Sequence, residues 1–320
     1  MHIQLTQKIQ NGDSLSKVEA VEFLKLGKDR LHEILYIGSV LRNHFRKQIS
    51  TCTITNAKNG KCSENCAYCA QSVHHDVNVE CYELRNPESI VKDAEINSKY
   101  GQFFSIVCSG RSPEKNELEQ ICETVKHINK NSPELSVCAS LGIMSVEELG
   151  QLKKSGLKRY HHNLESSKNF FDKVCTTHTY EDRAQTVKNA KEAGLQTCVG
   201  GLFGLGESYE DRADLLFEIK DLDPDAVPLN FLVPVKGTKL GNNKPVSMFE
   251  AVKIVALARM IMPEKDIKVC GGRLEVFKDS QALVFLAGAS SIMTGNLLTV
   301  KGRKPEEDFE LIKEFCNKHT

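Results

Sequence analysis

The stretch TCTITNAKNGKCSENCAYCAQS, residues 51–72, joins a β-rich run to a loop that carries three closely spaced cysteines. Its first seven residues are rich in threonine and isoleucine, which favour a strand. Seven further β-rich segments follow, and amphipathic helical segments separate them. The predicted strands span residues 51–57, 103–109, 134–140, 158–164, 195–201, 226–232, 266–272 and 289–295.

The repeating strand–helix pattern predicts the fold class. Eight such units in about 270 residues are typical of an α/β fold of the (β/α)8 TIM barrel type. A doubly wound sheet is the alternative, but no G-x-G-x-x-G follows the first predicted strand. Residues 1–50 are predicted to be helical, with Ser14 as a helix cap. We therefore predict an N-terminal helical segment over residues 1–50 and a single-domain barrel over residues 51–320.

Composition restricts the classes of partner. The 320 residues include 42 Lys and Arg and 42 Asp and Glu, so no net charge favours nucleic acid or an anionic membrane. We predict no secretory signal and no membrane span, and expect a cytoplasmic location. Twelve cysteines are many for such a chain, and thiols in a reducing compartment are more often metal ligands or catalytic groups than disulfides.

The cysteine loop indicates a metal cluster. Cys62, Cys66 and Cys69 have the spacing C-x3-C-x2-C. Structural zinc needs a fourth ligand, and no neighbouring C-x2-C or H-x3-H pair supplies it. A C-x2-C redox pair leaves Cys62 unexplained. Three thiolates on a short loop fit three irons of a 4Fe–4S cluster and leave the fourth iron open, which favours a catalytic cluster.

The ends of the other predicted strands carry more chemistry-bearing residues. In a barrel the active site lies at the carboxyl ends of the strands. Four cysteines there precede small residues: Cys108, Cys138, Cys198 and Cys270. Four polar residues end other strands on the same face: Asn163, Glu165, Asn230 and Arg273. We therefore predict a thiol-rich, polar site. Four cysteines lie in no motif and are predicted to be structural: Cys52, Cys122, Cys175 and Cys316.

The loop resembles the signature of the radical S-adenosylmethionine enzymes, with Tyr68 directly before Cys69. The string CSENCAYCAQS is similar to that of the biotin synthases in particular. Further similar strings follow in the same order between residues 50 and 300: YHHNLESS, TTHTYEDR, GGLFGLGE, LNFLVPVKGTKL, GGR and AGASSIMTGN. The resemblance implies a homodimeric barrel that cleaves S-adenosylmethionine to a 5′-deoxyadenosyl radical. It also implies that sulfur is inserted between C6 and C9 of dethiobiotin, with a flavodoxin or ferredoxin-type reductant.

The same resemblance implies a role for each matching residue. Cys62, Cys66 and Cys69 would hold the 4Fe–4S cluster, and Tyr68 would pack near the adenine. Asn163 and Glu165 would contact substrate and ribose, Arg183 would bind the methionine carboxylate, and Asn230 would bind the ureido ring. An auxiliary 2Fe–2S cluster, the implied sulfur donor, would be held by Cys138 and Cys198 with Arg273 as an unusual fourth ligand.

One position departs from this pattern. Ser105 stands where the family has its remaining auxiliary cysteine, and serine is a poor ligand for such a cluster. We therefore hypothesise an auxiliary cluster rebuilt from Cys138, Cys198 and one or both of Cys108 and Cys270. It could then differ in size from 2Fe–2S, with Arg273 reduced to balancing charge. Cys108 qualifies only where its strand has already ended, because an odd offset turns a side chain to the other face.

Two other functions remain open from the sequence. A different radical enzyme on the same barrel, such as a metallocofactor maturase or a carbon-skeleton mutase, would explain the changed auxiliary ligands. A non-enzymatic iron–sulfur or zinc-binding protein would explain the thiols alone. Asn230 argues against the first alternative, and Glu165 and Arg183 argue against the second.

Overall fold

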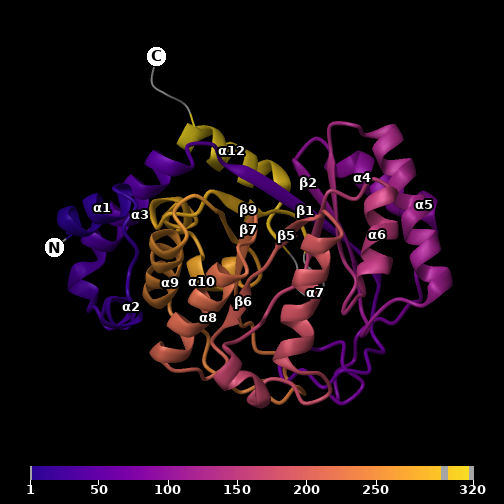
Figure 1. Cartoon of the computed structure of the whole chain (residues 1–320), viewed down its shortest axis with the longest axis horizontal. Helices are drawn as coiled ribbons and strands as arrows, with labels where there is room; N and C mark the ends of the chain where they lie inside the picture. The colour runs from indigo at the N-terminus through magenta and orange to yellow at the C-terminus, as the bar shows by residue number, and fades with distance from the viewer. Residues whose placement is uncertain (1, 297–301, 317–320) are drawn as a thin grey trace.

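A closed barrel of parallel strands forms the centre of the molecule (Figure 1). The computed structural model describes residues 2–296 and 302–316. In this part of the chain the strand order is β5-β4-β3-β2-β1-β9-β8-β7-β6, and a further pairing of β5 with β7 closes the sheet. The strands are β1 Ser50–Lys58, β2 Phe103–Cys108, β3 Ser136–Ser140, β4 Arg159–His161, β5 Gln196–Cys198, β6 Gly201–Phe203, β7 Ala226–Phe231, β8 Asp266–Val269 and β9 Ser291–Met293. β5 and β6 both pair with β7 and together occupy one strand position of the barrel. The predicted eight-stranded TIM barrel is therefore confirmed.

Helices surround the barrel on its outer face. They are α1 His2–Gln10, α2 Lys17–Leu24, α3 Leu31–Phe45, α4 Pro87–Asn97, α5 Lys115–Asn131, α6 Val146–Lys154, α7 Tyr180–Glu192, α8 Tyr209–Asp221, α9 Met248–Ile261, α10 Arg273–Phe277, α11 Leu283–Leu286 and α12 Pro305–Cys316. Helices α4 to α7 cover one side of the barrel, and α8 and α9 cover the other (Figure 1). The N-terminal α1, α2 and α3 form an outer layer against α8 and α9. None of the described helices is long and apolar enough to cross a membrane.

Capping residues place the start of several helices. Ser16 caps α2 and exchanges hydrogen bonds with Glu19, so the prediction of Ser14 as a cap in this segment is wrong. Only Ser16 has an acidic residue three positions later that can return the bond. Thr179 caps α7 in the same way with Asp182, and Ser208 caps α8 with Asp211. These boxes fix the first turns of the two helices that flank the site.

Strand alternation decides which side chains face the barrel interior. On β2, Ser105 and Val107 line the interior cavity, whereas Phe104 and Ile106 are buried in the layer under the helices. On β1, Cys52 and Ile54 face the same cavity. Alternation along the strands and closure of the barrel therefore decide which residues line the interior. Some of these residues belong to no sequence motif. The predicted division at residue 50 and the single domain remain predictions.

Candidate active site

The three loop cysteines converge on one small cavity. The loop follows β1, and Cys62, Cys66 and Cys69 line a cavity of about 180 Å³. Backbone hydrogen bonds close the loop on itself: Cys62 N donates to Gln71 O at 3.0 Å, and Val73 N donates to Cys62 O at 2.9 Å. The thiols therefore approach one another without a disulfide, and each is a free cysteine.

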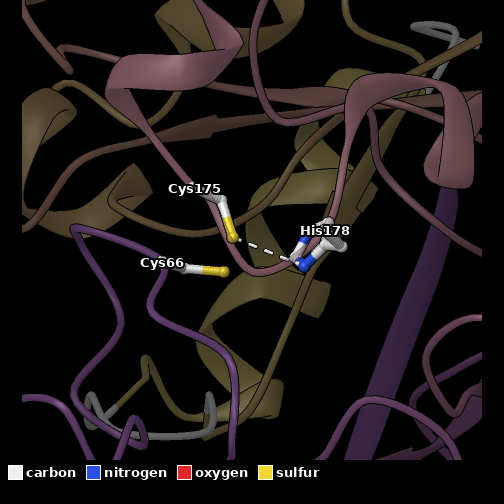
Figure 2. A group of neighbouring side chains, drawn as sticks. All are labelled: Cys66, Cys175 and His178. Atoms are coloured by element: carbon white, nitrogen blue, oxygen red, sulfur yellow. Dashed lines mark hydrogen bonds between the residues drawn. The ribbon is translucent and has the colours of Figure 1, made fainter.

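Cys175 lies beside this loop, although the sequence predicted it to be only structural (Figure 2). Within the described residues, the ligand atoms of Cys66, Cys175 and His178 lie within 4.8 Å of one another. Cys175 Sγ is 3.4 Å from His178 Nδ1. A hydrogen bond between the two thiols raises the pKa of Cys66 and lowers that of Cys175. Cys175 is therefore a neighbour of the cluster loop.

Hydrogen bonds around His178 join the loop to α7. Arg183 Nε donates to His178 Nε2 at 3.0 Å, so the neutral ring carries its proton on Nδ1. Nδ1 faces the carboxylate of Glu64, a buried residue of the loop itself. A nitrogen that donates to a carboxylate has no free lone pair for a metal ion, so the imidazole orients Arg183 relative to the loop.

Arg183, Asn163 and Glu165 meet at the end of β4. Thr179 caps α7, and Arg183 projects from its first turns. Arg183 NH1 donates to Asn163 O at 2.9 Å and lies 3.8 Å from Glu165 Oε1. Glu165 has a φ of 69°, which a non-glycine residue seldom adopts. The turn after β4 thus brings a cation and two hydrogen-bonding groups together near the cluster loop.

A second cavity, of about 370 Å³, occupies the barrel interior. Tyr68, Cys69 and Gln71 line both this cavity and the smaller one, so the two spaces adjoin. Asn230 lines the interior cavity, with Nδ2 donating to Gly201 O at 3.2 Å and Oδ1 accepting from Gly271 N at 2.9 Å. These bonds fix the amide plane and leave one donor and one acceptor position on the side chain free.

Four buried cysteines, from β1, β3, β5 and the end of β8, line the barrel cavity: Cys52, Cys138, Cys198 and Cys270. Two cationic side chains line it with them, Arg159 on β4 and Lys268 on β8. Burial raises the pKa of Cys138 to about 12. Burial alone would lower the pKa of Lys268, but the charges of neighbouring thiolates, Cys52 first, raise it. The cations and the thiols therefore stabilise each other's charged forms.

Two predicted auxiliary ligands lie elsewhere. Cys108 still belongs to β2 and follows Val107, which faces the barrel cavity, so Cys108 turns away from that cavity. It packs against the layer under the helices and borders the smaller cavity at the cysteine loop. Arg273 lies outside both cavities, where NH1 donates to Gln281 at 2.7 Å and to Asp308 at 3.1 Å. Gly272, with a φ of 74°, turns the chain so that Arg273 begins α10 and faces α12. Neither residue lines the barrel cavity with the four thiols, and the roles of Cys108 and Arg273 as auxiliary ligands stay predictions.

Cys52, Lys268 and Arg159 are the site residues that sequence reasoning missed. A signal was present for the two cations, because a charged residue inside a strand with buried neighbours needs a partner. Cys52 precedes Ile54 by two positions, so alternation places it on the same face. Which face is interior becomes clear only when the barrel closes.

The spacing of the thiols does not suit a single metal ion. A tetrahedral zinc site with Zn–S bonds of about 2.3 Å holds its sulfurs about 3.8 Å apart. In the described part of the chain, no three of the barrel thiols lie within 4.8 Å of one another, and the three loop thiols do not either. Both sets are therefore too open for a single ion and have the chemistry that iron–sulfur clusters require.

Comparisons with known proteins agree with this chemistry. The sequence model of the Radical SAM superfamily matches residues 58–219, and that of the Biotin and Thiamin Synthesis associated domain matches residues 228–315. Biotin synthase of Geotalea uraniireducens is 42% identical over 314 residues, which cover 97% of this chain and 95% of the relative. That of Methanococcus vannielii is 44% identical over 308 residues, covering 94% and 92%. The chain belongs to the biotin synthase family.

Solved structures share the fold of this biotin synthase family member. Methylornithine synthase (PylB) matches with a TM-score of 0.86 at 19% identity, covering 99% of this chain and 97% of the other. The FeFe-hydrogenase maturase HydG of Carboxydothermus hydrogenoformans matches with a TM-score of 0.82 at 20% identity, covering 98% and 77%. These likenesses show the barrel alone. Biotin synthases are radical SAM enzymes, so a 4Fe–4S cluster and S-adenosylmethionine are the cofactors of the family.

Proposed function

We propose that this chain is a biotin synthase, which inserts sulfur between C6 and C9 of dethiobiotin. The observation that carries the proposal is the barrel cavity, which adjoins the cysteine loop and is lined by four buried thiols. A radical generated at the loop and a sulfur source in the barrel would then share one space inside the barrel. The barrel walls limit the access of water to a reactive carbon there.

The residues of the loop and of β4 would bind the cofactors. Cys62, Cys66 and Cys69 would hold the 4Fe–4S cluster, which when bound supplies the electron that cleaves S-adenosylmethionine to the 5′-deoxyadenosyl radical. Arg183 would bind the methionine carboxylate and Glu165 the ribose. These two roles are supported by the position of Arg183 NH1, which lies 3.8 Å from Glu165 Oε1 beside the loop. Tyr68, which borders both cavities, would pack near the adenine.

The residues of the barrel interior would bind the substrate and the sulfur source. Asn163 would contact the substrate, and Asn230, held by β6 and Gly271, would offer its remaining donor and acceptor positions to the ureido ring. We propose Cys52, Cys138, Cys198 and Cys270 as the ligands of the auxiliary cluster, which when bound supplies the sulfide. With four thiolates this cluster need not be the 2Fe–2S type. The homodimer, the cytoplasmic location and the flavodoxin or ferredoxin-type reductant rest on family membership.

An anaerobic assay tests the proposal. The protein is reconstituted with iron and sulfide, and reductant, S-adenosylmethionine and dethiobiotin are added. Mass spectrometry then measures 5′-deoxyadenosine and biotin. We expect both products, and we expect biotin to disappear in Cys270→Ala while 5′-deoxyadenosine remains. 5′-Deoxyadenosine without biotin from the unaltered chain would contradict the substrate, and neither product from cluster-loaded protein would contradict the radical chemistry.

A further inference from the structure

Arg159 carries buried hydrogen-bond donors that no group of the described residues accepts. The side chain is 6% exposed, and within residues 2–296 and 302–316 its Nε and NH1 have no partner. Its NH2 donates to Gln196 Oε1 at 3.2 Å, and the guanidinium carbon lies 4.2 Å from the centre of the Phe103 ring. Burying an ionised donor without an acceptor is costly, so the free donors indicate a ligand in the cavity that Arg159 lines.

Lys268 is a second buried cation near the Phe103 ring. It is 2% exposed, and its Nζ lies 5.5 Å from the centre of the same ring. Among the described residues, neither Lys268 nor Arg159 has a carboxylate within ion-pair distance, whereas buried Arg273 has Asp308. The charges that act most on Lys268 are those of the thiols Cys52 and Cys198, followed by the carboxylate of Asp266. Arg159 acts on the thiols of Cys52, Cys138 and Cys198.

Charge balance connects these cations to the thiols. A cluster held by four thiolates is a net anion, because the thiolate charges exceed the charge of its iron–sulfide core. Two buried cations beside four thiols, with no carboxylate at ion-pair distance among the described residues, have the charge that such an anion requires. We propose that Arg159 and Lys268 are the counter-cations of the auxiliary cluster, and that Arg159 donates hydrogen bonds from Nε and NH1 to its sulfur atoms. This inference rests on the proposed cluster at the four barrel thiols.

The two side chains would act through the cluster as positioning residues. Positive charge and N–H donors at a cluster stabilise its reduced, more negative form and so raise its reduction potential. Removing them should lower the potential and weaken retention of the cluster. Neither effect depends on whether dethiobiotin is the substrate.

The test uses the full chain with Cys62, Cys66 and Cys69 changed to alanine, so that the auxiliary cluster alone is observed. In this background Arg159→Gln, Arg159→Lys and Lys268→Met are reconstituted anaerobically. Iron and sulfide are counted, the cluster is titrated by absorbance, and its loss to a chelator is timed. Arg42→Gln is the matched control, because Arg42 also has a buried Nε and NH1 without partners among the described residues but lies over Phe315, outside the cavity.

We expect Arg159→Gln and Lys268→Met to lower the potential and to speed cluster loss about tenfold, with Arg42→Gln unchanged. Arg159→Lys keeps the charge and should recover part of the potential, which separates loss of charge from failure to fold. Unchanged potential and iron content in both neutral variants would overturn the inference. A raised KM for dethiobiotin in the chain with its loop cysteines intact, without a change in potential, would assign the cations to the substrate and also overturn it. Absence of iron in the background chain itself would overturn the auxiliary cluster as well, whereas a bound cluster with no biotin formed would contradict only the proposed reaction.

Discussion

Cys52 lies in no motif, yet its thiol faces Lys268 and Cys198 inside the barrel. We predict that Cys52→Ala lowers the iron content of the reconstituted protein to that of the loop cluster, about four irons per chain. Cys122→Ala is the control, because Cys122 packs in the layer under the helices. Iron and sulfide analysis measures the difference. The same iron content in both variants would remove Cys52 from the ligand set.

His161 links the site to pH. It lines the barrel cavity, and burial lowers its pKa to about 4. Below about pH 6.5 the unfolded chain binds a proton at His161, whereas the folded chain binds it only near pH 4. The free energy of unfolding therefore falls as the pH is lowered from about 6.5 to about 4. For one histidine the loss at pH 5 is about 2 kcal/mol. We predict that His161→Asn removes this loss of stability at pH 5. The midpoints of urea unfolding at pH 7 and pH 5 should then differ less than in the unaltered chain. An equal difference in both proteins would show that His161 does not titrate in this way.

At the scale of elements, the break between β5 and β6 depends on Gly200. A Cβ there would lie 1.8 Å from the carbonyl oxygen of Pro228 on β7, so the backbone would have to move. We predict that Gly200→Ala lowers stability by about 3 kcal/mol and Tm by roughly 5 °C. Gly150→Ala is the control, because a Cβ at Gly150 in α6 meets nothing within 4 Å and alanine favours a helix. Thermal unfolding decides, and equal Tm values for the two variants would refute the close contact.

The elements themselves were largely predictable from sequence, but several contacts inside the barrel were not. All eight predicted strand segments contain strands, because the period of two and the turn residues are local signals. The motif residues Asn163, Glu165 and Arg183 lie together, and their roles remain predictions. Cys52 and Arg159 join the thiol site only through barrel closure, which no local pattern encodes. Spacing along the chain also does not reveal the turn at Gly272, after which Arg273 faces α12.

At the scale of the whole molecule, Arg273 joins the barrel to the C-terminal helix. Asp308 on α12 is fully buried and accepts from Arg273 NH1 at 3.1 Å, and Arg303 NH1 approaches it at 3.4 Å. Removing one partner of a buried pair leaves an uncompensated charge, which costs about 3–5 kcal/mol. We therefore predict that Asp308→Ala destabilises the protein strongly, as measured by thermal unfolding.

The same variant separates the structural contact from the cluster chemistry. Because Arg273 lies outside both cavities, Asp308→Ala at a permissive temperature should keep its iron and sulfide content. Glu310→Ala is the matched control on the same helix, since its exposed pair with Lys313 contributes less than about 0.5 kcal/mol. If Asp308→Ala keeps its Tm but loses the iron of the auxiliary cluster, Arg273 would be supported as a ligand of that cluster. Loss of stability with full iron content would instead show that α12 holds the barrel closed from outside.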